Sequence, residues 1–110
     1  MHDEPTIDDY IFRLEHDDDP EVRRNAAWLL GRQRDARIIA PLIAAVDDDD
    51  ASVRVRVAEA LGTIKDASVI PALLTALEDA AAEVRAQAAR SLGQRADQQA
   101  LHPLLVALQD

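Results

Sequence analysis

The chain repeats itself with a period of 31 residues, and no other feature of the sequence limits its possible folds as strongly. Each copy carries a V-R-x-x-[AV]-A-x-x-L-G pattern, which begins at Val22, Val53 and Val84. A period of this length is typical of proteins that stack one supersecondary unit, since no single unit can bury its apolar face alone. We therefore expect an array of similar units.

The first half of each copy has the apolar spacing of an amphipathic helix. In the first copy this stripe consists of Val22, Ala26, Ala27 and Leu30. The spacing predicts helices over roughly 20–31, 51–62 and 82–93. Gly31 follows the stripe, where a left-handed glycine commonly ends a helix, and the same ending is expected in the other copies.

The second half of each copy carries another helical stripe, such as Ile39, Leu42, Ile43 and Val46. It predicts second helices over about 36–46, 67–78 and 98–109. The preceding aspartates, Asp35, Asp66 and Asp97, are candidate N-caps. Pro41, Pro71 and Pro103 fall a little inside these helices, where each removes an amide donor, so we expect an irregular first turn or a later start.

Ahead of the first copy, Thr6 and the acidic residues after it predict a helix over 6–16. Its Tyr10, Ile11 and Leu14 follow the pattern of the second helices, so this helix forms half a repeat that covers the first core. We expect one domain over 1–110, with residues 1–5 flexible and repeats over 20–46, 51–78 and 82–109.

The repeated residues, followed in each copy by Asp and in two copies by Pro-Leu, resemble the short HEAT-like repeats of phycobilisome lyases and of many small bacterial and archaeal proteins. The resemblance covers residues 20–109. It implies an all-α fold, a right-handed α-solenoid of three HEAT-like helix pairs plus the N-terminal helix. It also implies that the second helices line a concave groove.

Charge and composition argue against several classes of partner. The chain has 21 acidic and 12 basic residues and a net charge of −9, which opposes binding to nucleic acid or to anionic membranes. The acidic N-terminus does not resemble a signal peptide, and the longest apolar stretch, Ile38 to Val46, is too short to span a bilayer. We expect a soluble, cytoplasmic protein.

No set of residues in the sequence resembles a catalytic or metal-binding motif. The chain has no cysteine, which excludes thiolate chemistry and disulfides. His2, His16 and His102 do not pair at a metal-ligand spacing on one helix face, and the serines have no histidine base in any repeat column. We therefore expect no enzyme, no metal and no cofactor.

Candidate binding residues lie where the copies differ, because packing explains the positions that they share. Phe12 lies off the apolar stripe of its helix and is a candidate exposed anchor. Trp28 occupies the column of Glu59 and Arg90, so it is a possible contact on the convex face, although it could also pack on neighbouring side chains. The expected groove residues are Phe12, Arg37, Ala44, Ser68, Thr75, Gln99, His102 and Val106.

Charged residues separate onto two edges of the predicted solenoid. Acidic residues precede the first helices and basic residues follow them, as helix-dipole complementation requires, and partner steering is the alternative. Arg23, Arg54 and Arg85 form a column beside the acidic loops. We interpret this column as a structural ladder of ion pairs with loop aspartates.

The leading functional hypothesis is an adaptor or scaffold that binds a peptide, helix or protein surface in the groove. The alternative that the resemblance suggests is a bilin lyase or a lyase-subunit-like protein. A third reading is a fragment of a longer array that self-associates through its C-terminal helix, because that helix ends the chain with Leu101, Leu104, Leu105 and Leu108.

Overall fold

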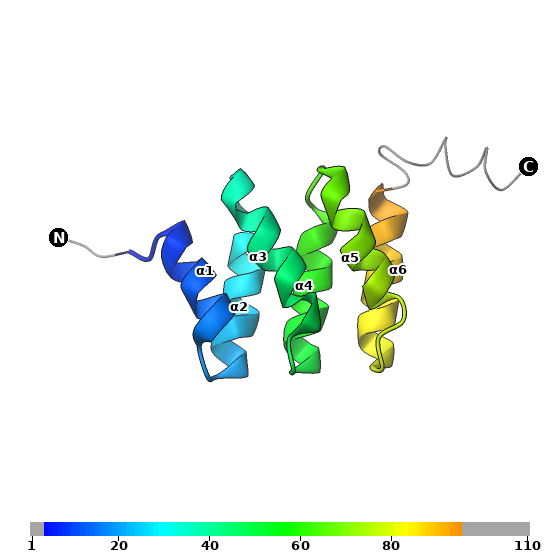
Figure 1. The fold of residues 1–110 in the computed structure, drawn as a ribbon, viewed down its shortest axis with the longest axis horizontal. Coiled ribbons are helices and arrows are strands. Elements are labelled where there is room, and N and C mark those ends of the chain that lie inside the picture. Colours follow the sequence, from blue (N-terminus) through cyan, green and yellow to red (C-terminus); the bar gives the residue numbers. More distant parts are fainter. Residues whose placement is uncertain (1–3, 96–110) are drawn as a thin grey trace, which may run out of the picture.

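The computed structural model describes residues 4–95 of the chain, and these residues form α-helices, short 3-10 helices and loops, without strands. Figure 1 shows the helices standing side by side in chain order from α1 to α6. Their bounds are α1 Ile7–His16, α2 Pro20–Leu30, η1 Ala36–Ile38, α3 Ile39–Ala44, η2 Ala45–Asp47, α4 Ala51–Gly62, η3 Ala67–Val69, α5 Ile70–Ala76 and α6 Ala82–Arg95.

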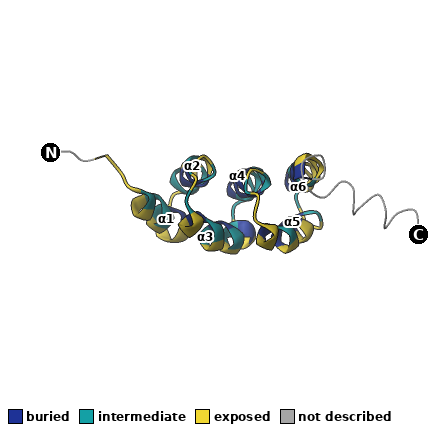
Figure 2. Ribbon diagram, turned by 90° about the horizontal axis from the view of Figure 1, so that it is seen from above, coloured by how far each residue is buried: buried dark blue, intermediate teal, exposed yellow. Residues whose placement is uncertain are grey.

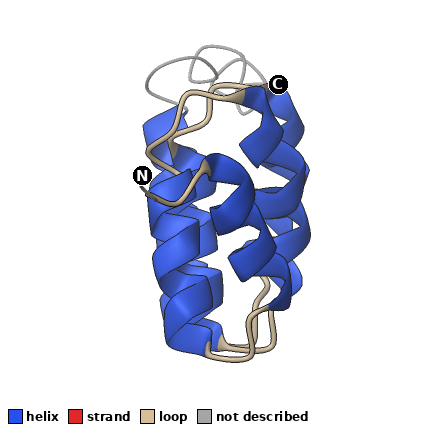
Figure 3. Cartoon of the chain, turned by 90° about the vertical axis from the view of Figure 1, so that its left-hand side faces the viewer, coloured by secondary structure: helices blue, strands red, loops and turns tan. Residues whose placement is uncertain are grey.

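The helices alternate between two layers, as a solenoid of helix pairs requires. Helices α2, α4 and α6, the first helices of the three copies, form the A layer, and α1, α3 and α5 form the B layer (Figure 2). Seen from the end of the array, the successive pairs overlap (Figure 3). Helix α4 packs extensively on both α2 and α6, which confirms the predicted all-α solenoid.

Side-chain caps set the helix starts where the sequence predicts them. Thr6 and Asp9 form a capping box at α1, and Asp19 and Asp50 cap α2 and α4. The predicted caps of the second helices are confirmed as well. Asp35 accepts a hydrogen bond from the Arg37 amide, and Asp66 accepts one from the amide of Ser68.

The second helices begin irregularly, as their prolines predict. A 3-10 turn, η1 or η3, comes first, and the α-helices α3 and α5 start only at Ile39 and Ile70. Pro41 and Pro71 have no amide hydrogen, so neither donates the bond that would extend the α-helix back by a turn. The helix predicted over 98–109, with Asp97 and Pro103, lies outside the described residues.

The expectation that Gly31 ends its helix in a left-handed conformation is wrong. Gly31 has φ −63° and ψ −15°, and none of the described residues has a positive φ. Close helix contact explains Gly31 and Gly62 instead. A Cβ on Gly31 would lie 2.6 Å from Ala60 Cβ, and one on Gly62 would lie 2.5 Å from Ser91 Oγ.

The core lies between the two layers. The central helix α4 contributes the most buried side chains, among them Val53, Val57 and Leu61, while Leu42 and Leu73 enter from the B layer. The apolar stripe that predicts the second helices includes residues that the structure does not bury. Leu74 remains 52% exposed, and Ile43, in the same column, is only half-buried.

Candidate functional site

The outward surface of α1, α3 and α5, here called the B face, carries three of the residues that the sequence predicts for the groove, Phe12, Ala44 and Thr75. Figure 2 shows exposed residues along this side of the B layer. Phe12 is the most exposed large apolar side chain of the described part, at 64%, and its ring centroid lies 4.7 Å from that of His16. It is not folded over the first core, so it is free to contact a partner.

Ala44 lines a shallow cavity of about 250 Å³ between α1 and α3. Leu14, Glu15, Pro41, Ala45, Asp47 and Asp48 contribute to the same cavity, so its lining combines apolar and acidic side chains. Glu15 follows Phe12 by three residues on α1, so the two side chains are neighbours on that helix. Phe12 itself does not line the cavity, but it lies on the same helix within one turn of Glu15, which does.

Arg37 is bound within the chain rather than free. Its guanidinium donates to both carboxylate oxygens of Asp35 and lies 3.1 Å from Oδ1 of Asp8 on α1. The hydrogen bonds from the Arg37 side chain and amide hold the pKa of Asp35 below its usual value. Arg37 thus connects the start of α1 to the first turn of the second helix.

Ser68 on η3 and Thr75 on α5 are both exposed but occupy different environments. Ser68 lies on η3, where its amide takes part in the Asp66 cap. The Thr75 hydroxyl donates to the Pro71 carbonyl at 3.2 Å and borders an acidic cavity with Asp47 and Asp48. The structure therefore does not gather the predicted residues into one cluster.

The remaining predicted residues, Gln99, His102 and Val106, lie outside the described residues, as does the C-terminal helix predicted to self-associate. Leu74 is the residue that the sequence reasoning missed. Leu74 lies one repeat after Ile43 and so falls on the apolar stripe that predicts the second helices, but its exposure depends on how far the neighbouring helices cover that column.

Trp28 lies on the A layer, 44% exposed. The guanidinium carbon of Arg32 lies 4.8 Å from the centroid of its ring, within the range of a cation–π contact. Arg56, Glu59 and Thr63 of the next repeat complete a small cavity of about 120 Å³ around the ring. Trp28 thus both packs on its neighbours and remains accessible.

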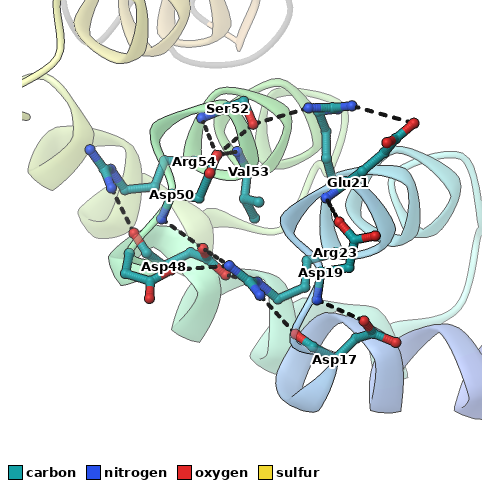
Figure 4. A network of polar contacts seen from close by, with 11 residues as sticks. Asp17, Asp19, Glu21, Arg23, Asp48, Asp50, Ser52, Val53 and Arg54 are labelled. Carbon is teal, nitrogen blue, oxygen red and sulfur yellow. Dashed lines mark hydrogen bonds and ion pairs between the residues drawn. The ribbon is translucent and has the colours of Figure 1, made fainter.

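The predicted arginine ladder is present in the described repeats (Figure 4). Arg23 Nε lies 2.9 Å from Asp48 Oδ2, and its Nη1 donates to the Asp17 carbonyl at 2.7 Å. Arg54 makes the same contacts one repeat later, with Asp79 Oδ2 at 2.8 Å and the Asp48 carbonyl at 2.7 Å. The ladder therefore joins each repeat to the next.

Both members of the second pair are shielded from water. The side chains of Arg54 and Asp79 are 17% and 11% exposed. Burial acts to raise the pKa of Asp79, but hydrogen bonds from Arg54 and from the Ala81 amide outweigh it, so the pKa lies below its usual value. The ladder arginines serve the fold, and Arg85 donates to the Asp79 and Ala80 carbonyls at the end of the described ladder.

Two further observations concern residues 4–95 alone. No group of three or more histidine, aspartate or glutamate side chains is arranged there to hold a metal ion. Among the helices of this part, none combines the length and the apolar character needed to cross a membrane.

The fold and the ladder together define an α-solenoid repeat protein, and comparisons with known proteins name its family. Residues 7–82 match the family model described as HEAT repeats, and residues 84–110 match the model described as PBS lyase HEAT-like repeat. The chain therefore belongs to the HEAT repeat family, which confirms the resemblance seen in the sequence. A comparison with curated proteins found no match.

Solved structures are also similar to this chain, and one of them matches it over nearly its whole length. It is the complex of CpcE and CpcF of phycocyanin lyase from Nostoc sp. PCC7120, one chain of which is 30% identical with a TM-score of 0.77. The match covers 99% of this chain and 44% of that chain. This chain thus spans less than half the length of that relative.

Proposed function

We propose that this chain is a protein-binding module, an adaptor or scaffold that holds a helix, peptide or protein surface against its B face. The observation that carries the proposal is the exposure of the large apolar residues on that layer. Phe12 on α1 is 64% exposed and Leu74 on α5 is 52% exposed. Exposed aromatic and aliphatic side chains of this kind act as anchors in protein interfaces.

The shape of the B face supports the proposal. The cavity beside Ala44 lies between α1 and α3, and its Leu14, Pro41 and Ala45 offer a place for an apolar side chain of a partner. Small residues at Ala44 and Thr75 leave room for the backbone of a bound helix or peptide. The arrangement supports binding rather than catalysis.

Binding can be tested by affinity capture with the native chain and with the Phe12→Asp, Leu74→Asp variant. The control is Asn25→Asp, Ala86→Asp, which places acids at exposed positions of the A layer and adds the same charge. We expect the native chain and the control variant to capture a partner that the B-face variant does not capture. Equal capture by all three proteins, with matching circular dichroism, would remove the B face from consideration.

A second candidate function is that of a lyase subunit. The similarity to one chain of the CpcE–CpcF complex favours it, at 30% identity over 99% of this chain. The sequence has no cysteine and no catalytic constellation, so such a role would lie in assembly with a second protein. This role can be tested by mixing the chain with a bilin, alone and together with candidate partner chains, and recording absorbance spectra. A bilin spectrum that stays unchanged in both mixtures would count against it.

A further inference from the structure

A cavity of about 400 Å³ opens between the loop that follows α2 and the loop that follows α4. This cavity lies away from the B face and plays no part in the function proposed above. Ile38, which is buried, and the half-buried Ile39 and Ile64 contribute its apolar lining. Arg34 and Lys65, both exposed, also line it, so the cavity combines an apolar surface with cationic groups.

The cavity continues onto the A layer. It shares Gly31, Arg32 and Thr63 with the small cavity around Trp28. The Thr63 hydroxyl lies 3.0 Å from the Gly31 carbonyl and 2.8 Å from the Ala60 carbonyl, which ties the two repeats together at this boundary. One surface therefore extends from the Trp28 ring, past Arg32, to Arg34 and Lys65.

The acidic residues that line this surface are already engaged. The Asp35 carboxylate is paired with Arg37, and the Asp66 carboxylate caps η3 through the Ser68 amide. Within residues 4–95, Arg34 and Lys65 make no ion pair. The larger cavity is thus lined by three basic side chains, Arg32, Arg34 and Lys65, and two acidic ones, Asp35 and Asp66, a net positive lining on a chain whose net charge is −9.

The loop that follows α4 forms one wall of the cavity, and a side chain outside the cavity holds this loop in place. Arg95, which is buried, donates to the carbonyls of Ile64, Lys65 and Asp66. This side chain positions the loop backbone and so preorganises the cavity. A ligand that enters therefore does not have to order the loop first.

We infer that this surface binds an acidic peptide segment of a partner protein, with a large apolar side chain seated between Trp28 and the isoleucines and flanking carboxylates beside Arg32, Arg34 and Lys65. The apolar lining fits a side chain, and the cations fit carboxylates on either side of it. Nucleic acid fits less well, because it lacks the apolar side chain and the acidic edge of the chain repels it.

Trp28 makes the test specific to this site, because the chain contains a single tryptophan. The probe is a 12-residue peptide of glutamates with one central phenylalanine, and its counterpart has glutamine in place of each glutamate. We expect a saturable change in Trp28 emission with the glutamate peptide, weakened by added salt. Arg34→Glu, Lys65→Glu should lower the affinity at least about tenfold.

The control variant Arg13→Glu, Arg90→Glu changes the net charge equally at positions outside both cavities, and it should bind like the native chain. Three results would overturn the inference. They are no saturable response to the glutamate peptide at millimolar concentration, equal binding of the glutamine peptide, or equal loss in the control variant. Emission that changes with protein concentration alone would assign the surface to a second copy of this chain instead.

Discussion

Arg54 and Asp79 face each other across a repeat boundary, with Arg54 Nε 2.8 Å from Asp79 Oδ2 and Nη2 3.1 Å from Oδ1. The Arg54 guanidinium also donates to the Asp48 carbonyl, so one side chain joins the acidic loops before and after its own helix pair. Because Arg23 repeats this arrangement with Asp48 and Asp17, the pair is a structural unit of the array.

Replacement of Arg54 by glutamine should destabilise the fold substantially. The change leaves Asp79 Oδ2 and the Asp48 carbonyl without their donor in a shielded site, and we expect a loss of about 1–3 kcal/mol in the free energy of unfolding. Arg56→Gln, two residues away, breaks a pair whose side chains are each 44% exposed, and it should cost at most about 0.5 kcal/mol. Urea denaturation followed by circular dichroism compares the two, and equal losses would contradict the ladder.

The coupling between Arg54 and Asp79 should disappear in acid. The pKa of Asp79 lies below its usual value, so the pair contributes its stability above about pH 4, the pKa of an unfolded aspartate. This contribution is lost as the pH falls through the folded pKa. A double-mutant cycle with Arg54→Gln and Asp79→Asn should give a clear coupling energy at pH 7 that decreases as the pH falls below about 4. A coupling energy that does not change with pH would refute this assignment.

Gly62→Ala should destabilise the packing of α4 on α6. The added Cβ would lie 2.5 Å from Ser91 Oγ and 3.1 Å from Ser91 Cα, so the helices must separate, at a cost of about 1–3 kcal/mol. Gly93→Ala is the matched control, since none of the described atoms lies within 4 Å of a Cβ there. Gly93→Ala should stabilise α6 by up to about 1 kcal/mol. Thermal denaturation should therefore show shifts of opposite sign.

Thr6→Ala should loosen the start of α1. The change removes the hydroxyl that accepts from the Asp9 amide at 3.2 Å, and loss of such a cap costs about 1 kcal/mol. Amide hydrogen exchange at Asp9 and Tyr10 should accelerate. Thr75→Ala, whose hydroxyl only contacts the Pro71 carbonyl within its own helix, should leave exchange in α1 unchanged. Unaltered exchange after Thr6→Ala would show that tertiary contacts alone hold this helix end.

Much of the fold could be predicted from the sequence because the repeat encodes it locally. The stripe that starts at Val22 and recurs at Val53 and Val84 predicts the A-layer helices, and α2, α4 and α6 begin and end within about two residues of the predicted bounds. The caps at Asp35 and Asp66 and the irregular turns before Pro41 and Pro71 also depend only on neighbouring residues.

The surface could be predicted less well, because it depends on how the repeats stack. The sequence suggested a binding role for Arg37, but its guanidinium pairs with Asp35, two residues earlier, and with Asp8, which only the packing of α1 brings close. It also placed Leu74 in the buried stripe, whereas the neighbouring helices leave that side chain half in water. Such exposures are decided by distances between helices, and a one-dimensional pattern does not contain them.

By itself, then, the sequence determined the helix pairs, their caps and the repetition of the arginine ladder, since each follows from residue type at a local spacing. Only the tertiary structure explains why residues 31 and 62 are glycines. Ala60 and Ser91 of the next helix come too close to Gly31 and Gly62 for a larger side chain. The tertiary structure alone decided that Trp28 and Lys65, far apart in the sequence, border connected cavities, because the loops after α2 and α4 come together only when the repeats stack.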